Sequence, residues 1–544
     1  MKGIRYISAF LACMFVFATG HSVQIRRGSG TSIPEHILPT DRDNPELWAP
    51  ASKQLLTRAV APGGYALNDI PRTDTIVYPL VLVDFIDRPF TIRDTTALLK
   101  RYERMFNEEG YTDSAIYIHR GIICHGATGS VSDYFRDQSY GQFVPKFEII
   151  GPVHPSKSYA YYGNGKDANV VYLIREICDS ISAKGLVDLS GFARNGSIDQ
   201  LSVIYAGRGE NYDGSDINTI WPQASIISNY NRHGINSIKY ACTCELFWDS
   251  DTILDGIGTF CHEFSHTLGL PDFYNTTSQQ ESETNSSMGY WSLMDYGNYE
   301  NEGFSPVGYT AFEKYSLGWM DIEEISYAGS YTLNDISIKA DLDNDIHTAY
   351  RLNTGHDDQF IILENHIKTG WYKYHASEGL MVTAVNYDNN SWVNNTVNSN
   401  RAIKHYYILP ADNDRNRNTN AGDLFPYQNI DSITTLGTPT LKVGSSYPPY
   451  SIYQIRFNNG IVSFHASPDM PSNIENRQIQ DVSINLEDGR LSVNAPAGST
   501  VTIYDISGRP VSKIITSEPV QQLQLPGHGI WIIKCGDVVR KIQK

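Results

Sequence analysis

The sequence is poor in basic residues, with 43 lysines and arginines against 60 aspartates and glutamates in 544 residues. The formal net charge of −17 leaves no general excess of cations with which to neutralise phosphates. We therefore expect no nucleic-acid partner. Carboxylates in such numbers either keep a protein soluble or form weak calcium sites in loops.

Long hydrophobic runs are missing beyond the N-terminus, which argues against a membrane-spanning helix in the mature protein. At the N-terminus, Lys2 and Arg5 precede an apolar run from Ile7 to Ala18 that is too short to span a bilayer. Small residues follow it, as a signal peptidase requires. Residues 1–20 are therefore interpreted as a secretory signal peptide.

Cysteine is scarce as well, with seven in the chain. Six of them follow the predicted signal peptide. Export permits disulfides, but six cysteines can pair in 15 ways and the sequence does not choose among them. The Cys242-Thr-Cys244 spacing is not that of a zinc ribbon, and no second such pair exists. The cysteines after the signal peptide are Cys124, Cys178, Cys242, Cys244, Cys261 and Cys535.

Alternating strand and helix patterns predict an α/β domain at residues 74–325. The run TIVYPLVLVDF, from Thr75 to Phe85, is short, apolar and rich in β-branched residues, which is typical of a buried strand. A second strand is expected at Gln200–Gly207. Apolar residues three and four apart predict helices at Ala97–Phe106 and Val170–Ser182.

The segments on either side of this domain have different patterns. Residues 21–73 contain Pro and Gly breaks and little periodicity, so we interpret them as a pro-segment or linker. Residues 326–468 contain short strand-like runs between Gly- and Asn-rich turns, which predicts a β-sandwich domain. A break that contains proline precedes a small β unit at residues 469–544. The chain has no evident solenoid-type repeat.

Two histidines, a glutamate and an aspartate stand in the largely apolar stretch GTFCHEFSHTLGLPDFY, residues 258–274. His262 and His266 are four residues apart, which on a helix puts both imidazoles on one face, close enough to share one ion. Neutral imidazole is a good zinc ligand. Glu263 follows the first histidine, where it can take a proton from a zinc-bound water and pass it to a leaving amine. We therefore expect Glu263 to be the catalytic base.

A catalytic zinc ion usually has three protein ligands plus water, so two histidines leave one ligand to be found. The downstream candidates are Asp272, Glu281 and Glu283. Gly269, three residues after His266, can turn the backbone sharply, and Asp272 follows three residues later. The two glutamates stand in QQESETNSSMG, a polar stretch that does not favour a buried helix. The spacing therefore favours Asp272 as the third ligand.

The segment MGYWSLMDYGNY adds two more candidates. It holds Met294 in a tight, glycine-flanked stretch, and in the metzincin signature a methionine turn lies beneath the metal after the ligand helix. We predict that role for Met294. Tyr296, two residues further on, is a candidate to stabilise an oxyanion with its phenol.

Taken together, these motifs resemble the secreted immune inhibitor A-type metalloproteases, a metzincin-like group. The resemblance covers residues 75–465 and implies a metzincin-like catalytic domain. It also implies that His262, His266 and Asp272 bind zinc and that Glu263 is the base. It is carried by VLVDF, GSVSDYFRDQSYGQF, IDQLSVIYAGRGE, IWPQ, HEFSHTLGLPDFY, WSLMDYG followed by LGW, and the segments at Phe360 and Ile408.

Calcium is a second cofactor that the family resemblance raises. Members of the group often carry an Asp- and Gly-rich turn before the VIYAG strand, whereas this chain has RNGSIDQ (Arg194–Gln200), which is poorer in carboxylates. The loop ADNDRNRNTNAGD (Ala411–Asp423) offers more oxygen ligands, and a solvated loop is the alternative there.

The last segment resembles the C-terminal sorting domain of type IX secretion substrates. TIYDISGRPV (Thr502–Val511), GIWIIK (Gly529–Lys534) and the basic end VVRKIQK carry this resemblance. It implies export through the periplasm of a Gram-negative bacterium, with the outer-membrane secretion machinery as partner. The product would be secreted or held at the cell surface. An ordinary β-sandwich binding module is the alternative.

The sequence therefore predicts a secreted, monomeric zinc endopeptidase that acts on protein or peptide substrates. Two alternatives stay open. One is a catalytically idle surface adhesin on a protease scaffold, and the other is a zinc hydrolase that acts on non-peptide bonds. The intact Glu263 counts against the adhesin, because an idle site has no need of the base.

Overall fold

In the computed structural model the chain forms two compact units, unit 1 up to Asp469 and unit 2 from Met470 onward, which are described separately. The predicted signal peptide and pro-segment lie outside the described residues, and so do Glu281 and Glu283. The described residues are 76–469, with gaps at 114–116, 120–121, 125, 164–167, 213–217, 249, 277–286, 401 and 415–418, and 483–543, with gaps at 488–489, 496, 519, 528 and 536–537.

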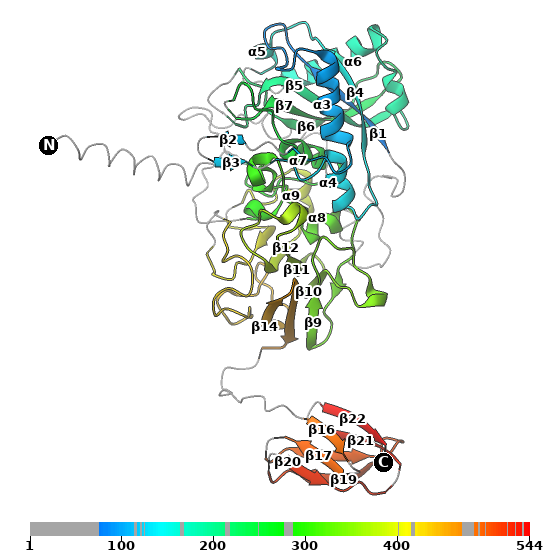
Figure 1. Cartoon of the computed structure of the whole chain (residues 1–544), viewed down its shortest axis with the longest axis vertical. Helices are drawn as coiled ribbons and strands as arrows, with labels where there is room; N and C mark the ends of the chain where they lie inside the picture. Colours follow the sequence, from blue (N-terminus) through cyan, green and yellow to red (C-terminus); the bar gives the residue numbers. More distant parts are fainter. Residues whose placement is uncertain are drawn as a thin grey trace, which may run out of the picture. The chain divides into compact units, whose positions relative to one another are not determined.

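A five-stranded sheet in the order β4-β1-β5-β7-β6 forms the centre of the first half of unit 1 (Figure 1). β1 (Val77–Val83) lies between β4 (Lys146–Val153) and β5 (Ser197–Arg208) and runs parallel to both. β7 (Ser237–Leu246) is parallel to β5. β6 (Gln223–Ile227) pairs antiparallel with β7 and forms the edge of the sheet.

Alternate residues of β1 enter two different apolar cores, because successive side chains of a strand point to opposite faces. Leu80 and Leu82 join a core with residues of α3 (Thr95–Asn107), α4 (Val131–Gln138) and α7 (Gly258–Thr267). Val81 and Val83 join a second core with residues of α6 (Ala168–Ala183). Helices therefore cover both faces, which explains why β1 is apolar almost throughout rather than alternating.

The predicted helices are present, with slightly wider bounds than the periodicity gave. The helix expected at Ala97–Phe106 is α3, which starts two residues earlier because the Asp94 side chain caps it by accepting from the Ala97 N–H. The helix expected at Val170–Ser182 is α6 (Ala168–Ala183). Shorter elements of this half are α5 (Tyr159–Tyr162), η2 (Leu189–Phe192) and the β2 (Tyr117–His119) and β3 (Ile122–Cys124) pair.

Two further sheets follow, in the orders β13-β12-β11-β10-β8 and β14-β15-β9, and residues from both share one apolar core. Apart from the parallel pair of β8 and β10, the pairs in these sheets are antiparallel. The strands are β8 (Glu323–Glu324), β9 (Gly329–Leu333), β10 (Ala349–His356), β11 (Gln359–His366), β12 (Gly379–Asn386), β13 (Tyr406–Ile408), β14 (Ser451–Asn458) and β15 (Ile461–Ser467). Short helices are η3 (Gly289–Trp291), η4 (Tyr296–Gly303), α8 (Ala311–Ser316), η5 (Leu342–Asn344), η6 (Gly370–Tyr372) and α9 (Asn389–Val393).

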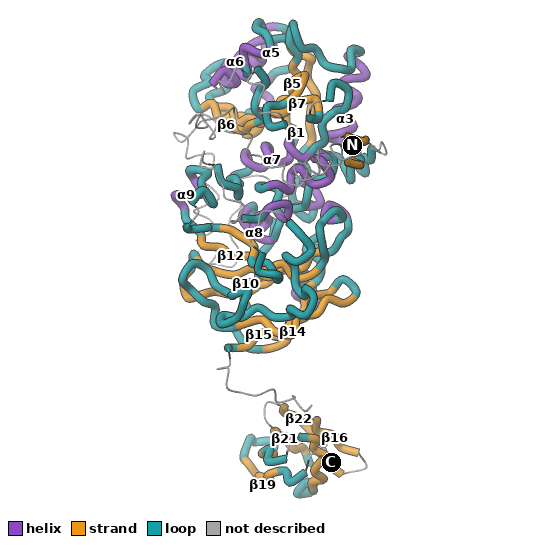
Figure 2. The backbone as a smooth tube through the Cα atoms, turned by 90° about the vertical axis from the view of Figure 1, so that its left-hand side faces the viewer, coloured by secondary structure: helices purple, strands orange, loops and turns teal. Residues whose placement is uncertain are grey.

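Helix α7 (Gly258–Thr267) lies between the β4-β1-β5-β7-β6 sheet and the second set of strands, with α8 and α9 in the same region (Figures 1 and 2). All of its residues are buried. Gly258 is required at its start, because a Cβ atom there would lie 1.9 Å from the carbonyl oxygen of Asn298. The helix that carries the polar motif is therefore enclosed by protein.

Unit 2 is built from strands alone within its described residues. Sheets in the orders β16-β17-β20 and β19-β18-β21-β22 enclose a small core that includes Leu491, Val493, Val501, Ile503 and Ile533. The strands are β16 (Ser483–Glu487), β17 (Arg490–Asn494), β18 (Thr500–Tyr504), β19 (Pro510–Ile515), β20 (Val520–Leu523), β21 (Ile530–Cys535) and β22 (Val538–Gln543).

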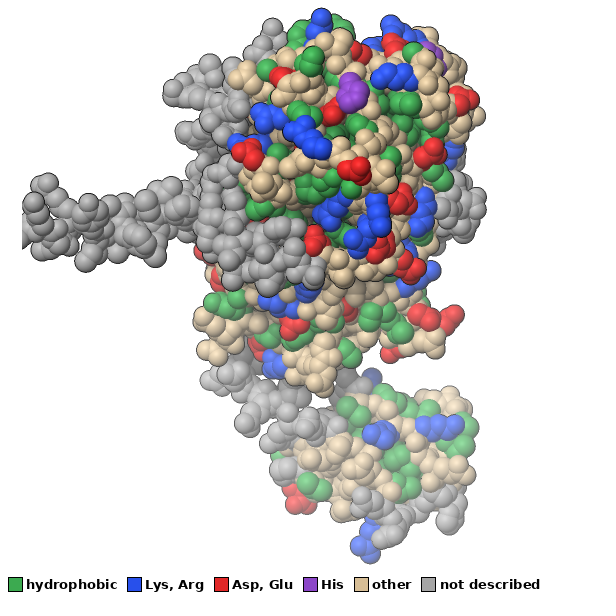
Figure 3. Space-filling view, turned by 45° about the horizontal axis from the view of Figure 1, so that its top comes forward, with side chains coloured by type: hydrophobic (Ala, Val, Ile, Leu, Met, Phe, Trp, Pro, Cys, Tyr) green, Lys and Arg blue, Asp and Glu red, His purple; other side chains and the backbone are tan. Residues whose placement is uncertain are grey.

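Acidic and basic side chains are interspersed on the described part of the face shown in Figure 3. The net charge of −17 is therefore not gathered into one patch on that face. In the part of the chain that the structure describes, no helix combines the length and hydropathy needed to cross a membrane.

Five of the six cysteines after the predicted signal peptide are buried free thiols, and Cys124 lies outside the described side chains. No disulfide forms among these five. The stability of the described units therefore comes from their apolar cores and hydrogen bonds. The free thiols belong to Cys178, Cys242, Cys244, Cys261 and Cys535.

Candidate metal centre

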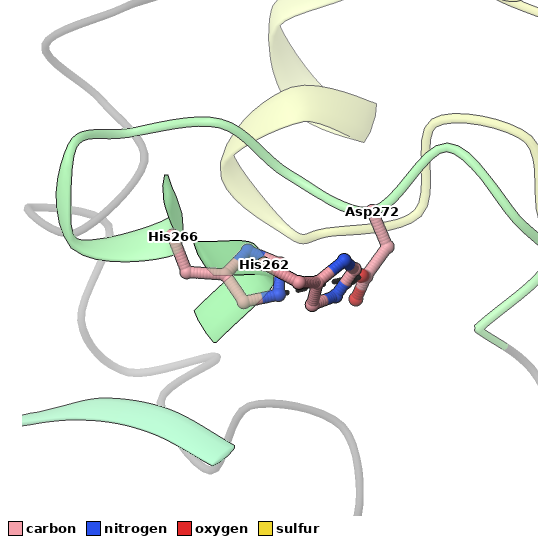
Figure 4. Close-up of side chains that lie close together, drawn as sticks. All are labelled: His262, His266 and Asp272. Carbon is pink, nitrogen blue, oxygen red and sulfur yellow. Dashed lines mark ion pairs between the residues drawn. The ribbon is translucent and has the colours of Figure 1, made fainter. Parts of the chain in front are cut away.

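His262 and His266 lie on one face of α7, as their spacing predicts, with ring centroids 4.7 Å apart. The helix ends at Thr267, and Gly269 takes a φ of +105°, a conformation that favours glycine. The chain turns there and brings Asp272 back to the histidines. Asp272 Oδ1 lies 3.0 Å from His262 Nε2 and 3.3 Å from His266 Nε2 (Figure 4).

The tautomers of both histidines follow from their hydrogen bonds. His262 Nδ1 is 2.8 Å from the carbonyl oxygen of Leu293, and His266 Nδ1 is 2.7 Å from that of Leu270. A carbonyl oxygen only accepts hydrogen bonds, so each Nδ1 carries the proton. In its neutral form each ring then presents the lone pair of Nε2 toward Asp272, which is the arrangement of metal-bound histidines.

These three side chains fit a divalent cation. Their ligand atoms all lie within 4.8 Å of one another, and all three residues are buried. Asp272 Oδ1 is a buried atom with no hydrogen-bond donor. It faces the Nε2 lone pairs of the two neutral imidazoles, which are acceptors as well. Three converging acceptors repel one another unless a cation or a proton lies between them. Two imidazoles and one carboxylate form a ligand set that suits zinc.

The charge states of the site are set by burial and by mutual proximity. Burial by itself would raise the pKa of Asp272, but the adjacent imidazoles of His266 and His262 hold it well below its usual range. Asp272 is therefore the carboxylate that stays ionised. Burial raises the pKa of Glu263 to about 8, while the neighbouring His262 and the N–H of Ala224 in β6 act to lower it. The two carboxyl groups thus differ in proton affinity, as separate ligand and base roles require.

Met294 lies in the segment that positions His262. It is fully buried and directly follows Leu293, whose carbonyl oxygen accepts from His262 Nδ1. The carbonyl oxygen of Met294 accepts from the N–H of Phe273 at 2.7 Å, one residue after Asp272. The Met294 segment thus contacts both the helix and the returning chain.

Tyr274 is a site residue that the sequence reasoning missed. Its ring stacks on His262, with centroids 6.4 Å apart and planes at 22°. Burial raises the pKa of its phenol well above the usual value, and the carboxylates of Asp272 and Glu263 add to this effect. Tyr296 stacks on Tyr274 at 6.5 Å, so Tyr274 contacts the rings of both. The signal that could have found it is its position two residues after Asp272.

Two carboxylates of the predicted calcium loop, Ala411–Asp423, accept hydrogen bonds. Asp423 Oδ2 accepts from Trp291 Nε1 at 2.7 Å and from the N–H of Asn420 at 3.0 Å. Asp412 Oδ1 accepts from the N–H of Asp414 at 2.8 Å. Within the described residues, the geometry expected of a metal site is found at His262, His266 and Asp272. Calcium binding in this loop stays a prediction.

Part of the sequence is similar to a known protein family. Residues 67–321 match a peptidase domain. The matching model is that of the immune inhibitor A peptidase M6, catalytic domain, and the matched segment contains α7, Asp272 and Met294. The candidate metal centre therefore lies inside the peptidase match.

Curated relatives agree with the peptidase match. Pre-pro-metalloprotease PrtV of Vibrio cholerae serotype O1, in strains M66-2 and ATCC 39315 / El Tor Inaba N16961, is 26% identical to this chain over 307 residues. The similarity covers 47% of this chain and 31% of the relative, so the chain spans less than a third of the length of these relatives. Together, the peptidase match and the relatives support a metalloprotease.

Proposed function

We propose that this chain is a secreted zinc-dependent endopeptidase that hydrolyses peptide bonds of protein substrates. The observation that carries the proposal is the convergence of His262, His266 and Asp272 on one point, with the donor-free Asp272 Oδ1 facing two imidazole lone pairs. Glu263 directly follows His262 in the sequence, and it interacts electrostatically with His262 and Asp272. The peptidase match and the metalloprotease relatives support the same reading.

In this proposal His262, His266 and Asp272 would hold zinc, with the imidazole orientations set by Leu293 and Leu270. A bound zinc ion would supply Lewis acidity for the substrate carbonyl and would lower the pKa of water to about 7. The chain itself supplies three buried residues whose ligand atoms already lie within 4.8 Å of one another.

Glu263 would accept the proton of the attacking water and then donate it to the leaving nitrogen. A base serves best when its pKa lies near the operating pH, and burial raises the pKa of Glu263 to about 8 without a cation beside it. A neighbouring dication would bring this pKa down toward neutrality. The side chain therefore has the proton affinity to hold a proton between the two steps.

An oxyanion would be stabilised by a phenol at this site. Tyr296 is the candidate from the sequence, and Tyr274 is the candidate that stacks directly on His262. A phenol with a raised pKa stays protonated at neutral pH and can donate a hydrogen bond to developing negative charge.

Delivery to the cell exterior is part of the proposal. We propose that the signal peptide and the sorting segment at residues 469–544 direct export through the outer-membrane secretion machinery of a Gram-negative bacterium. The partition of the chain after Asp469 gives this segment a core of its own, which suits a separable address domain.

Digestion of casein by the purified chain, with and without a chelator, tests the function. We expect one zinc ion per chain, cleavage within the polypeptide, loss of cleavage with chelator and recovery on adding zinc. Zinc binding without cleavage of any protein, but with hydrolysis of ester or amide model compounds, would favour a non-peptide hydrolase. Neither zinc binding nor hydrolysis would favour the idle adhesin and overturn the proposal.

A further inference from the structure

Asn395 forms two hydrogen bonds with Asp272. Its Oδ1 accepts from the Asp272 N–H at 2.6 Å, and its Nδ2 donates to Asp272 Oδ2 at 2.7 Å. Asn395 is 1% exposed and lies 123 residues further along the chain, just after α9. We infer that Asn395 is a positioning residue that sets the third metal ligand. The inference deepens the proposed function and rests on it.

The two bonds leave the Asn395 amide one orientation. The backbone N–H of Asp272 only donates, so the atom that faces it must be the oxygen, and the amide nitrogen must then face the carboxylate. Oδ2 of Asp272 is occupied in this way. Oδ1 is left without a donor, beside the two Nε2 atoms. Asn395 therefore presents Asp272 as a ligand through a single oxygen.

Neighbours of Asn395 hold the same turn at several other points. Trp392 Nε1 donates to the carbonyl oxygen of Gly269 at 3.3 Å, and Asn398 Nδ2 donates to that of Phe273 at 2.7 Å. Thr276 Oγ1 donates in return to the carbonyl oxygen of Asn395 at 2.6 Å. The segment 392–398 thus fixes the backbone on both sides of Asp272.

An asparagine suits this position for two physical reasons. Its amide donates without a charge, so Asp272 keeps its full negative charge for a cation, whereas an arginine or lysine would neutralise it. Its backbone φ is +52°, in the left-handed region that asparagine tolerates better than most residues. A carboxylate at the same place would repel that of Asp272.

Asn395 lies outside the peptidase match, which ends at residue 321. The segment that carries it follows β12 of the second set of strands. The metal centre is therefore assembled from the matched peptidase segment and from a residue of the β-rich region that follows it.

The test uses the full chain with Asn395→Gly and Asn395→Asp. Glycine tolerates the positive φ and removes both hydrogen bonds. Aspartate keeps an acceptor for the Asp272 N–H, but it replaces the donor to Oδ2 with a second negative charge. Asn394→Ala is the matched control, because the Asn394 side chain donates to the backbone and side-chain oxygens of Asn390 within α9 rather than to Asp272.

Zinc affinity is measured by competition with a chromophoric chelator, and the melting temperature is measured with and without zinc. We expect the zinc Kd to rise about 10- to 100-fold in both Asn395 variants, as for other residues that orient metal ligands, and to stay unchanged in Asn394→Ala. Zinc should raise the melting temperature less in both Asn395 variants than in the wild-type chain or Asn394→Ala. This rise reports zinc affinity separately from the stability of the metal-free fold.

Three outcomes separate this inference from the proposed function. A wild-type zinc Kd in both Asn395 variants, with zinc bound by the wild-type chain and lost in Asp272→Ala, overturns the inference alone. Absence of zinc binding by the wild-type chain overturns the proposed function and the inference with it. Weaker zinc binding in Asn395→Asp supports the inference even if Asn395→Gly fails to fold.

Discussion

The carboxylate of Glu313 accepts a hydrogen bond from the backbone N–H of Met294 at 3.3 Å. The same oxygen accepts from Ser292 Oγ at 2.7 Å, and the other accepts from the N–H of Thr310 at 2.7 Å, where α8 begins. Glu313 thus ties the Met294 segment to α8. It is wholly buried, and burial raises its pKa to about 7.

Replacing this carboxyl group should change how stability depends on pH. The pKa of Glu313 is higher in the folded chain than in the unfolded one, so its contribution is greatest at low pH and is lost as pH rises from about 4.5 through 7. Glu313→Gln cannot ionise and lacks this loss. The stability deficit of the variant should therefore shrink by up to about 3 kcal/mol between pH 5 and pH 8. Denaturant unfolding at both pH values measures it, and a constant deficit would contradict the prediction.

Glu263→Gln should retain zinc and the fold but lose nearly all hydrolysis. The amide cannot accept a proton, and general-base assistance typically contributes about 10²- to 10⁴-fold in rate. Zinc content and casein cleavage are measured on the same preparation. Near wild-type cleavage by a preparation free of other proteases would end the mechanism proposed for this residue.

Asp272→Ala should lose zinc and activity together, because two histidines leave the ion one ligand short. Glu281→Ala and Glu283→Ala are matched controls and should keep both. Asp272→His should restore part of the binding, since imidazole takes this place in the commoner metzincin string. Stoichiometric zinc in Asp272→Ala, with loss in either glutamate variant, would assign the third ligand elsewhere.

Gly269→Ala should weaken zinc binding through the backbone alone. The φ of +105° at Gly269 strains any residue with a Cβ atom by about 1–3 kcal/mol, and relief of that strain would move Asp272. Gly355→Ala is the control, because Gly355 has a φ of +87° with no atom near its Cβ position and lies in the hairpin between β10 and β11. Both variants should lose stability, but only Gly269→Ala should lose zinc affinity. Equal zinc Kd values in the two variants would show that the backbone turn at Gly269 does not position Asp272 for zinc binding.

Cutting the chain after Pro471 should leave the metal centre intact and change its destination. Unit 2 has a core of its own, and His262, His266 and Asp272 all lie in unit 1. We expect the truncated enzyme to bind zinc and cleave casein, yet to accumulate in the periplasm. Immunoblots of periplasmic and external fractions measure this, and normal export of the truncated chain would refute the sorting role.

Local patterns predicted the parts of the site that lie close together in the sequence. The i, i+4 spacing placed His262 and His266 on one face of α7, and Gly269 allowed the turn that returns Asp272. In the same way, apolar periodicity located α3 and α6 to within about two residues, a usual margin for helix ends. These signals are local, because helix and turn geometry depend on neighbouring residues.

The rest of the site depends on contacts that leave no local signal. Asn395 meets Asp272 across 123 residues, and asparagines are common in the loops of this chain. Glu313 could be recognised as part of a capping box with Thr310, but not as the partner of Met294. The order of the strands, with β6 antiparallel at an edge, likewise follows from long-range pairing.

The dependence of Asp272 on Asn395 also sets an order of events in time. A ribosome makes α7 and both histidines well before it makes residue 395, and domains generally fold in that order. The histidine pair can therefore form while the third ligand is still unrestrained. If Asn395 orients Asp272 as inferred above, we expect full affinity for a metal ion only after the second set of strands has folded, so a partly made chain should bind the ion weakly.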